Sequence, residues 1–490
     1  MTNRVVLALG PLILVTTLIL EPAWGLTEPA WHVAGLAVWM ATWWLSGVIA
    51  LEATALLPIV FLPLVGTRTI REVTASYADP IIFLFLGGFL LAVTLERWEL
   101  HRRFAVATVR KVGTDAPRVV LAFMIASAVA SMWISNTATA VMMLPIAMAL
   151  TGGQGGKGGR AEGRKGGSVD QANPQASAGF PTALMLGIAY ACSIGGVATL
   201  IGTPPNAILA GAASELLGHE ISFAGWMLVG LSISIPMLFC CWVLLITVFR
   251  VRGEVPGLQS TLERERSEFG ALSGGERFVL SVFAFAALAW ILRAPKTMGD
   301  LRIPGLSDYV PGLSDPAIAI AAALLLFAVP LRRSRFPTAL DWNTARRIPW
   351  GILLLFGGGL ALAGAFQSSG LSDWVGGRLA AMQGVHFVFI ILTTAAVFVF
   401  LTELTSNTAT AALGMPLMVG VAQGLEVAAL PLMTAAALAA SMAFMLPVAT
   451  PPNAIVFGSG AIRSRDMALA GIGLNILSIL VITIVVSLLL

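Results

Sequence analysis

The sequence predicts an all-α polytopic membrane protein with about 11 transmembrane helices and two re-entrant hairpins, arranged as an inverted repeat. Three observations predict this class. Of the 490 residues, 57% are hydrophobic and only 11% are charged, whereas a soluble domain has about 25% charged residues. Apolar runs long enough to cross a bilayer recur along the whole chain. Several short motifs also occur twice, in the same order.

The composition excludes other classes of protein. So few charges could not cover the surface of a soluble enzyme of this length, and the high apolar content excludes a disordered chain. The alternating pattern of an outer-membrane barrel is absent. The net charge of +4 comes from basic residues in short loops, so nucleic acid is not an expected partner. The three cysteines lie inside apolar runs, which favours neither a disulfide framework nor a metal cluster.

The first apolar run follows Arg4 and is interpreted as a membrane helix rather than a cleaved signal, because no good cleavage site follows it. Loops rich in Lys and Arg stay in the cytoplasm, and these are 97–118, 157–165, 250–277 and 332–347. That orientation also puts the amino terminus in the cytoplasm. The predicted spans are 5–20, 31–50, 52–66, 80–97, 180–210, 223–249, 276–293, 315–331, 350–371, 430–460 and 467–490.

The run 119–150 lies between two basic loops and is too short for two crossings. A hairpin that enters and leaves on the cytoplasmic side resolves this conflict. Irregular backbone at its tip is tolerated only when it is buried in protein or faces a watery cavity. The expected tip is Ser135-Asn136-Thr137.

Four landmarks recur in the same order. They pair Phe85-x-Gly87-Gly88 with Phe356-x-Gly358-Gly359, Ser135–Ala140 with Ser406–Ala411, Pro145 with Pro416, and Thr203–Ile208 with Thr450–Ile455. The positions of the basic loops give the two copies opposite orientations, so the second hairpin, about 387–425, enters from outside. Inverted repeats with interrupted helices are typical of secondary transporters, which bind their substrate near the membrane midplane.

A glycine-rich insert, present only in the first copy, is interpreted as a flexible cytoplasmic linker, and it lacks the residues of a phosphate-binding loop. The repeats and this linker predict five segments. The segments are a first helix with an outer loop at 1–30, a first repeat at 31–250 that contains the linker 151–177, a cytoplasmic connector at 251–275, and a second repeat at 276–490.

The repeated motifs offer uncharged polar groups at mid-membrane. Ser-Asn-Thr at a hairpin tip supplies hydroxyls and an amide. Where one half-helix ends, its free carbonyls suit a small cation, and where the next begins, its free N–H groups suit a carboxylate. Proline in Thr-Pro-Pro-Asn breaks the helix, so we expect both long spans 180–210 and 430–460 to be interrupted. No Arg or Lys lies near these motifs, so a bound cation is expected to neutralise an anion there.

Paired Ser-Asn-Thr motifs, each followed by a Pro-Pro-Asn turn, resemble the divalent anion/sodium symporter family, which includes di- and tricarboxylate transporters. Ala75–His101 and Met445–Gly458 resemble it too. The resemblance implies eleven membrane helices plus two hairpins, in a homodimer whose transport domains move as elevators against scaffold domains. It also implies sodium-coupled symport of dicarboxylates, such as succinate, malate or fumarate. The lack of targeting signals and the short loops indicate a bacterial inner membrane.

The resemblance also implies ligand residues. One sodium ion would be held by Ser131, Ser135, Asn136 and the backbone of Gly202, and a second by Thr402, Thr405, Asn407 and the backbone of Ala449. Thr405 departs from the family pattern, which often has a smaller residue there. The substrate carboxylates would meet Ser135, Asn136, Thr137, Ser406, Asn407 and Thr408, with Thr203, Pro204, Thr450 and Pro451 completing the pocket.

Other interpretations stay open. An exchanger of the same fold would swap dicarboxylates without sodium flux, and hydroxyls and amides alone do not separate dicarboxylates from citrate or sulfate. Polar residues in membrane helices can also simply join helices. Glu403 beside the second motif is functional, a structural hydrogen-bond partner, or a residue at an exposed hairpin position, since Met132 takes its place in the first copy. A channel is disfavoured by the inverted repeats. An enzyme is not expected, because His219-Glu220 lacks the second histidine of a zinc-protease motif.

Overall fold

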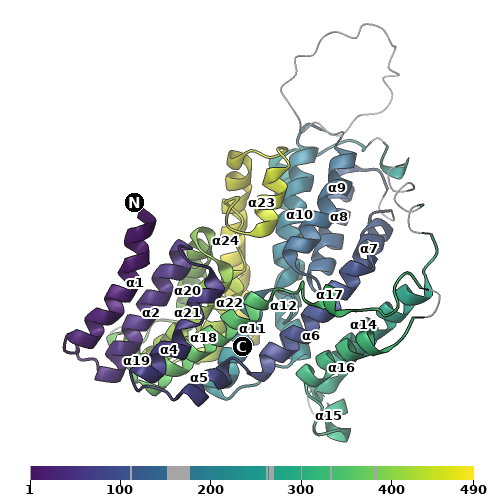
Figure 1. Ribbon diagram of the computed structural model, residues 1–490. Helices are drawn as coiled ribbons and strands as arrows, with labels where there is room; N and C mark the ends of the chain where they lie inside the picture. Colours follow the sequence, from purple (N-terminus) through teal and green to yellow (C-terminus); the bar gives the residue numbers. More distant parts are fainter. Residues whose placement is uncertain are drawn as a thin grey trace.

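The computed structural model is built almost entirely of helices, with one short two-stranded ribbon (Figure 1). It describes residues 2–110, 113–151, 177–255, 257–260, 263, 267, 270–298, 301–331, 334–379 and 383–490. Within those ranges, seven helices are long and apolar enough to cross a membrane, and shorter apolar helices accompany them. The predicted linker 151–177 lies outside the described residues except at its two ends, as does part of the connector 251–275.

The described residues of the first half of the chain form twelve helices. They are α1 (Thr2–Ile19), α2 (Glu28–Ser46), α3 (Leu51–Thr54), α4 (Leu57–Leu64), α5 (Ile70–Ser76), α6 (Pro80–Arg97), α7 (Leu100–Arg110), α8 (Ala116–Ser131), α9 (Asn136–Leu150), α10 (Phe180–Gly196), α11 (Pro204–Leu217) and α12 (Phe223–Val248).

The second half begins with α14 (Gly274–Arg293), the antiparallel strands β1 (Lys296–Met298) and β2 (Leu301–Ile303), and α15 (Leu306–Tyr309). It continues with α16 (Asp315–Ala328), α17 (Trp342–Ala345), α18 (Trp350–Ser368), α19 (Leu371–Leu379), α20 (Phe387–Leu404), α21 (Asn407–Leu425), α22 (Ala429–Ala440), α23 (Pro451–Gly458) and α24 (Ser464–Leu489).

Most expected spans coincide with one helix, and the differences lie at prolines. The span predicted at 52–66 is divided between α3 and α4, with Pro58 in the first turn of α4. Proline suits that position because the first turn of a helix needs no N–H donor. The long spans 180–210 and 430–460 are interrupted as predicted, since α11 and α23 each begin at the first proline of a Thr-Pro-Pro-Asn motif.

The interrupted helices join the two repeats. α10 packs against the pair α8 and α9, while α22 packs against the pair α20 and α21. Their continuations cross over, so that α11 contacts α21 and α22, and α23 contacts α9 and α10. Small residues permit the close approach of these helices: a Cβ built on Gly195 of α10 would lie 2.2 Å from the carbonyl oxygen of Ala128 in α8. The motifs of both repeats are therefore brought together in one region.

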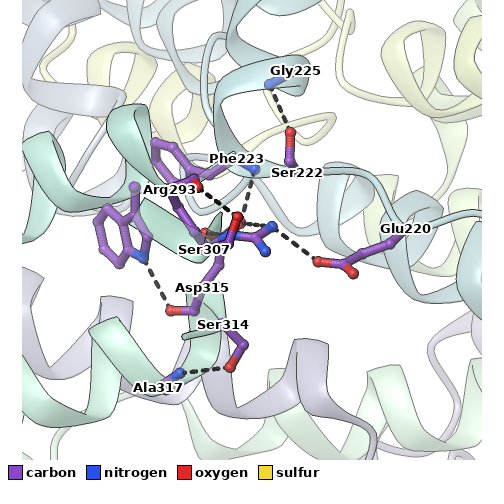
Figure 2. Close-up of polar contacts among 10 residues, drawn as sticks. Glu220, Ser222, Phe223, Gly225, Arg293, Ser307, Ser314, Asp315 and Ala317 are labelled. Carbon is purple, nitrogen blue, oxygen red and sulfur yellow. Dashed lines mark hydrogen bonds and ion pairs between the residues drawn. The ribbon is translucent and has the colours of Figure 1, made fainter. Parts of the chain in front are cut away.

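A buried ion pair fastens the start of α12 to α14 and α16 (Figure 2). Arg293, at the end of α14, approaches Asp315 of α16 with an Nε–Oδ1 distance of 2.5 Å, and both side chains are buried. The same guanidinium lies 2.9 Å from Glu220, which precedes α12. The backbone N–H of Phe223 donates to Asp315 Oδ2 at 3.0 Å. Charge-assisted contacts thus link three helices that are far apart in sequence.

Candidate functional site

A cavity of about 590 Å³ lies where the two repeats meet. Both Ser-Asn-Thr motifs and both Thr-Pro turns line it, although they come from four separate parts of the chain. The C-terminal end of α2 and the N-terminal end of α18 also line the cavity, through residues such as Trp44 and Ile352. All ten residues expected at the substrate lie on its wall: Ser135, Asn136, Thr137, Thr203, Pro204, Ser406, Asn407, Thr408, Thr450 and Pro451.

Four helices begin at this cavity. α9 starts at Asn136, α11 at Pro204, α21 at Asn407 and α23 at Pro451, and each of these residues lines the cavity. The first N–H groups of a helix have no partner within the helix, and the helix dipole makes this end positive. Side chains cap two of these starts, because Ser135 accepts from the Ala138 N–H at 3.2 Å and Thr450 from the Asn453 N–H at 3.3 Å. The remaining donors suit an anion.

The first half-site gathers oxygen atoms around a glycine. The buried Ser131 hydroxyl donates to Asn136 Oδ1 at 2.5 Å. A Cβ built on Gly196 would lie 2.7 Å from Asn136 Oδ1 and 3.2 Å from the carbonyl oxygen of Gly202. These two oxygens therefore border one small space that only glycine leaves free. Hydroxyl, amide and carbonyl oxygens are the ligands that a hard cation prefers.

The second half-site repeats this pattern with threonines. The buried Thr402 hydroxyl lies 2.7 Å from Asn407 Oδ1 and 2.8 Å from the carbonyl oxygen of Ala440. The Thr405 hydroxyl lies 2.8 Å from the Leu401 carbonyl oxygen and 2.6 Å from the Thr410 hydroxyl. The Thr405 hydroxyl is thus bonded to both arms of the hairpin, to Leu401 of α20 and Thr410 of α21.

Six of the eight expected sodium residues line the cavity: Ser135, Asn136, Gly202, Thr405, Asn407 and Ala449. The other two, Ser131 and Thr402, lie one layer behind it and contact the asparagines.

The asparagines of the Thr-Pro-Pro-Asn motifs bind backbone carbonyl oxygens where each interrupted helix is broken. The sequence motifs alone did not predict this role. Asn206 Nδ2 donates to the carbonyl oxygens of Gly196, Val197 and Thr199, the shortest at 2.7 Å. Asn453 Nδ2 donates in the same way to Ala443 at 3.2 Å and Leu446 at 3.1 Å. The presence of both asparagines at equivalent positions was the available signal.

The wall of the cavity is nearly free of ionisable groups. Among the described residues that line it, Glu403 alone has an ionisable side chain. An anion in this cavity would therefore meet helix starts and hydroxyls but no guanidinium or ammonium group. Its charge would need a cation bound beside it, because an unpaired charge in a low-dielectric site is costly.

Comparisons with known proteins agree over nearly the whole chain. A family model described as the sodium:sulfate symporter transmembrane region matches residues 2–489. A sodium-dependent dicarboxylate transporter of Staphylococcus saprophyticus is 41% identical over 483 residues, covering 98% of this chain and 90% of the relative. Its Staphylococcus aureus counterpart is 39% identical over 485 residues with the same coverage. The crystal structure of the YdaH transporter of Alcanivorax borkumensis shares the fold, with a TM-score of 0.55 and 15% identity over 94% of this chain and 98% of that one.

Proposed function

This chain belongs to the sodium:sulfate symporter family, and from that premise we propose that it couples sodium to the uptake of dicarboxylates such as succinate, malate or fumarate. The family resemblance inferred from the repeated motifs is confirmed. The relatives named as sodium-dependent dicarboxylate transporters share about two residues in five with this chain over nearly its full length. Their names supply the substrate class of the proposal.

The observation that carries the proposal is the meeting of four helix starts around one cavity without basic side chains. Helix starts bind anions, and the paired motifs provide two equivalent clusters of donors on the lining of the cavity. An anion with two separated carboxylates can engage one cluster with each. We assign Ser135, Asn136 and Thr137 to one carboxylate and Ser406, Asn407 and Thr408 to the other, with Thr203, Pro204, Thr450 and Pro451 shaping the walls.

Sodium supplies the positive charge that the cavity lacks. We assign the first ion to Ser131, Ser135, Asn136 and the Gly202 backbone, and the second to Thr402, Thr405, Asn407 and the Ala449 backbone. The same asparagines border both the ion positions and the anion position. Binding of one ligand therefore prepares the site for the other, and this reciprocity is the physical basis of coupled transport.

The arrangement in the membrane follows from the inverted repeat. We propose eleven membrane helices with α8–α9 and α20–α21 as opposed re-entrant hairpins, the amino terminus in the cytoplasm, and an inner-membrane location. The hairpins and interrupted helices would form a moving unit, in an elevator mechanism, within each protomer of a homodimer. The α2 end and the α18 start, which line the cavity, are expected on the cytoplasmic side, and this expectation supports an inward-facing state.

Succinate uptake into proteoliposomes tests this function. With internal succinate absent, we expect uptake to require an inward sodium gradient. Uptake that appears only after the lumen is loaded with dicarboxylate would instead identify an exchanger of the same fold. If succinate is not transported in either condition while citrate or sulfate is, the fold assignment stands and the substrate class is wrong.

A further inference from the structure

Glu403 is the acidic residue of the cavity wall, and its carboxylate is bound on every side by N–H groups. The backbone N–H groups of Phe444, Met445 and Leu446 donate to it at 2.6, 2.9 and 3.1 Å. The side-chain amide of Asn475, from α24, donates at 2.8 Å. Only 4% of the Glu403 surface is exposed, and Asn475 is fully buried. In all four contacts the carboxyl group accepts, which is the role of an ionised carboxylate.

The three backbone donors belong to the loop between α22 and α23. Three successive N–H groups turned toward one point form a cradle for an anion, and here Glu403 of the hairpin arm α20 occupies that cradle. The opposite side of the loop is held by Asn453, which donates to the carbonyl oxygens of Ala443 and Leu446. Leu446 in turn accepts from the Ala449 N–H at 3.2 Å. Glu403 is thus connected through one turn to the backbone assigned to the second sodium ion.

The first repeat is built without this charge. Met132 stands at the position equivalent to Glu403, and its carbonyl oxygen accepts from the Thr199 hydroxyl at 2.5 Å. The loop before α11 is held by neutral groups instead: Asn206 binds three of its carbonyl oxygens, and the Trp226 indole donates to Val197 at 3.0 Å. The two half-sites therefore have similar shapes and different charges.

We propose that Glu403 is a positioning residue that fixes the loop Phe444–Leu446 and, by its negative charge, makes the second half-site bind sodium more tightly than the first. This inference rests on the proposed function, because it assumes that the half-sites hold sodium. Among the described residues, the four groups that hydrogen-bond to the carboxylate are neutral donors. A sodium ion between Thr402, Asn407 and Ala449 is the full positive charge that balances it, and opposite charges attract strongly in a low-dielectric site.

The test measures sodium binding without transport. The thermal unfolding of the purified protein is followed as sodium replaces choline at constant ionic strength, with no dicarboxylate present. For the wild type we expect stabilisation that saturates with sodium. Glu403→Gln keeps the shape and removes the charge, and we expect its half-saturating sodium concentration to rise about tenfold. Met132→Gln is the matched control in the first repeat, and we expect a change of less than about twofold, since no charge is lost.

The outcomes separate the alternatives. If Glu403→Gln lowers stability equally in sodium and choline and leaves the half-saturating concentration unchanged, the residue is only structural and the inference is wrong. If Glu403→Gln does not fold, Glu403→Asp decides, because it keeps the charge but is one methylene too short to reach all four donors. We expect a rise of roughly threefold for Glu403→Asp, and an unchanged value would overturn the inference. Absence of sodium stabilisation in the wild type would contradict the proposed function itself.

Discussion

Asn136 and Asn407 are the residues on which the proposed site depends most. Each begins a helix at the cavity and holds a hydroxyl from the preceding helix, Ser131 at 2.5 Å and Thr402 at 2.7 Å. In the proposed site, each asparagine serves both an ion and the substrate. A single substitution at either asparagine should weaken the binding of both sodium and the substrate.

We predict that Asn136→Ala or Asn407→Ala abolishes sodium-driven succinate uptake, with a loss of at least about a hundredfold, because one change removes an ion ligand and a substrate ligand. Uptake into proteoliposomes measures the effect, and size-exclusion chromatography checks that both variants still fold. Uptake at the wild-type rate in both variants would remove the site assignment.

Gly196 gives a second prediction at the same scale. Its missing side chain leaves the space between Asn136 Oδ1 and the Gly202 carbonyl oxygen free, so Gly196→Ala should push the Asn136 amide away. We expect the half-saturating sodium concentration for uptake to rise about tenfold. The equivalent residue of the second repeat is Ala443, and the matched control Ala443→Gly should change this value by less than about threefold. Equal effects of the two substitutions would contradict the geometry.

The sequence predicted the residues of the cavity better than their contacts. The Ser-Asn-Thr and Thr-Pro motifs were visible because they recur letter for letter, and all ten expected substrate residues line one cavity. The contacts of Glu403 could not be predicted, since its partners lie between 41 and 72 positions away along the chain. Only packing of α20 against α22 and α24 brings them together.

At the scale of the element, prolines mark the breaks in helices, and a buried ion pair connects neighbouring helices. The division of the span 52–66 into α3 and α4 shows that hydropathy alone overestimates helix length near Pro58. The ion pair of Arg293 with Asp315 (Figure 2) was not predictable, because the strands β1 and β2 separate these two helix ends along the chain.

We predict that Arg293→Met destabilises the protein by roughly 3–5 kcal/mol, because it leaves the buried Asp315 carboxylate without its cation. The control is Arg302→Met, which removes an exposed guanidinium paired with Asp308 and should cost less than about 1 kcal/mol. Thermal unfolding in detergent compares the two variants. Similar melting temperatures would show that the buried pair does not hold α12 to α14 and α16.

The glycine-rich insert gives a prediction for a connecting element. The second repeat has no counterpart to it, so nothing in the paired site depends on it. Deletion of Gly152–Gly167 should leave succinate uptake within about twofold of the wild type, as expected for a linker. Loss of uptake at normal expression would show that the insert has a role beyond connection.

At the scale of the whole molecule, the repeated motifs would explain why the proposed site needs both halves of the chain. Each interrupted helix starts against its own hairpin and continues against the other repeat, as the contacts of α11 with α21 and of α23 with α9 show. The motif offset predicted that the copies are paired. It could not predict this crossing, which depends on tertiary packing. The crossing places four helix starts around one cavity, where sodium and a dicarboxylate can meet.

The most direct test of this account is succinate binding to the purified protein, measured by isothermal titration calorimetry in sodium and in choline at equal ionic strength. No basic side chain stands among the described residues that line the cavity, so its affinity for a dianion should come from sodium bound beside it. We predict binding in sodium and none detectable in choline. Equal affinity in both salts would contradict the account, because the cavity would then bind the anion without the ion that the proposed coupling requires.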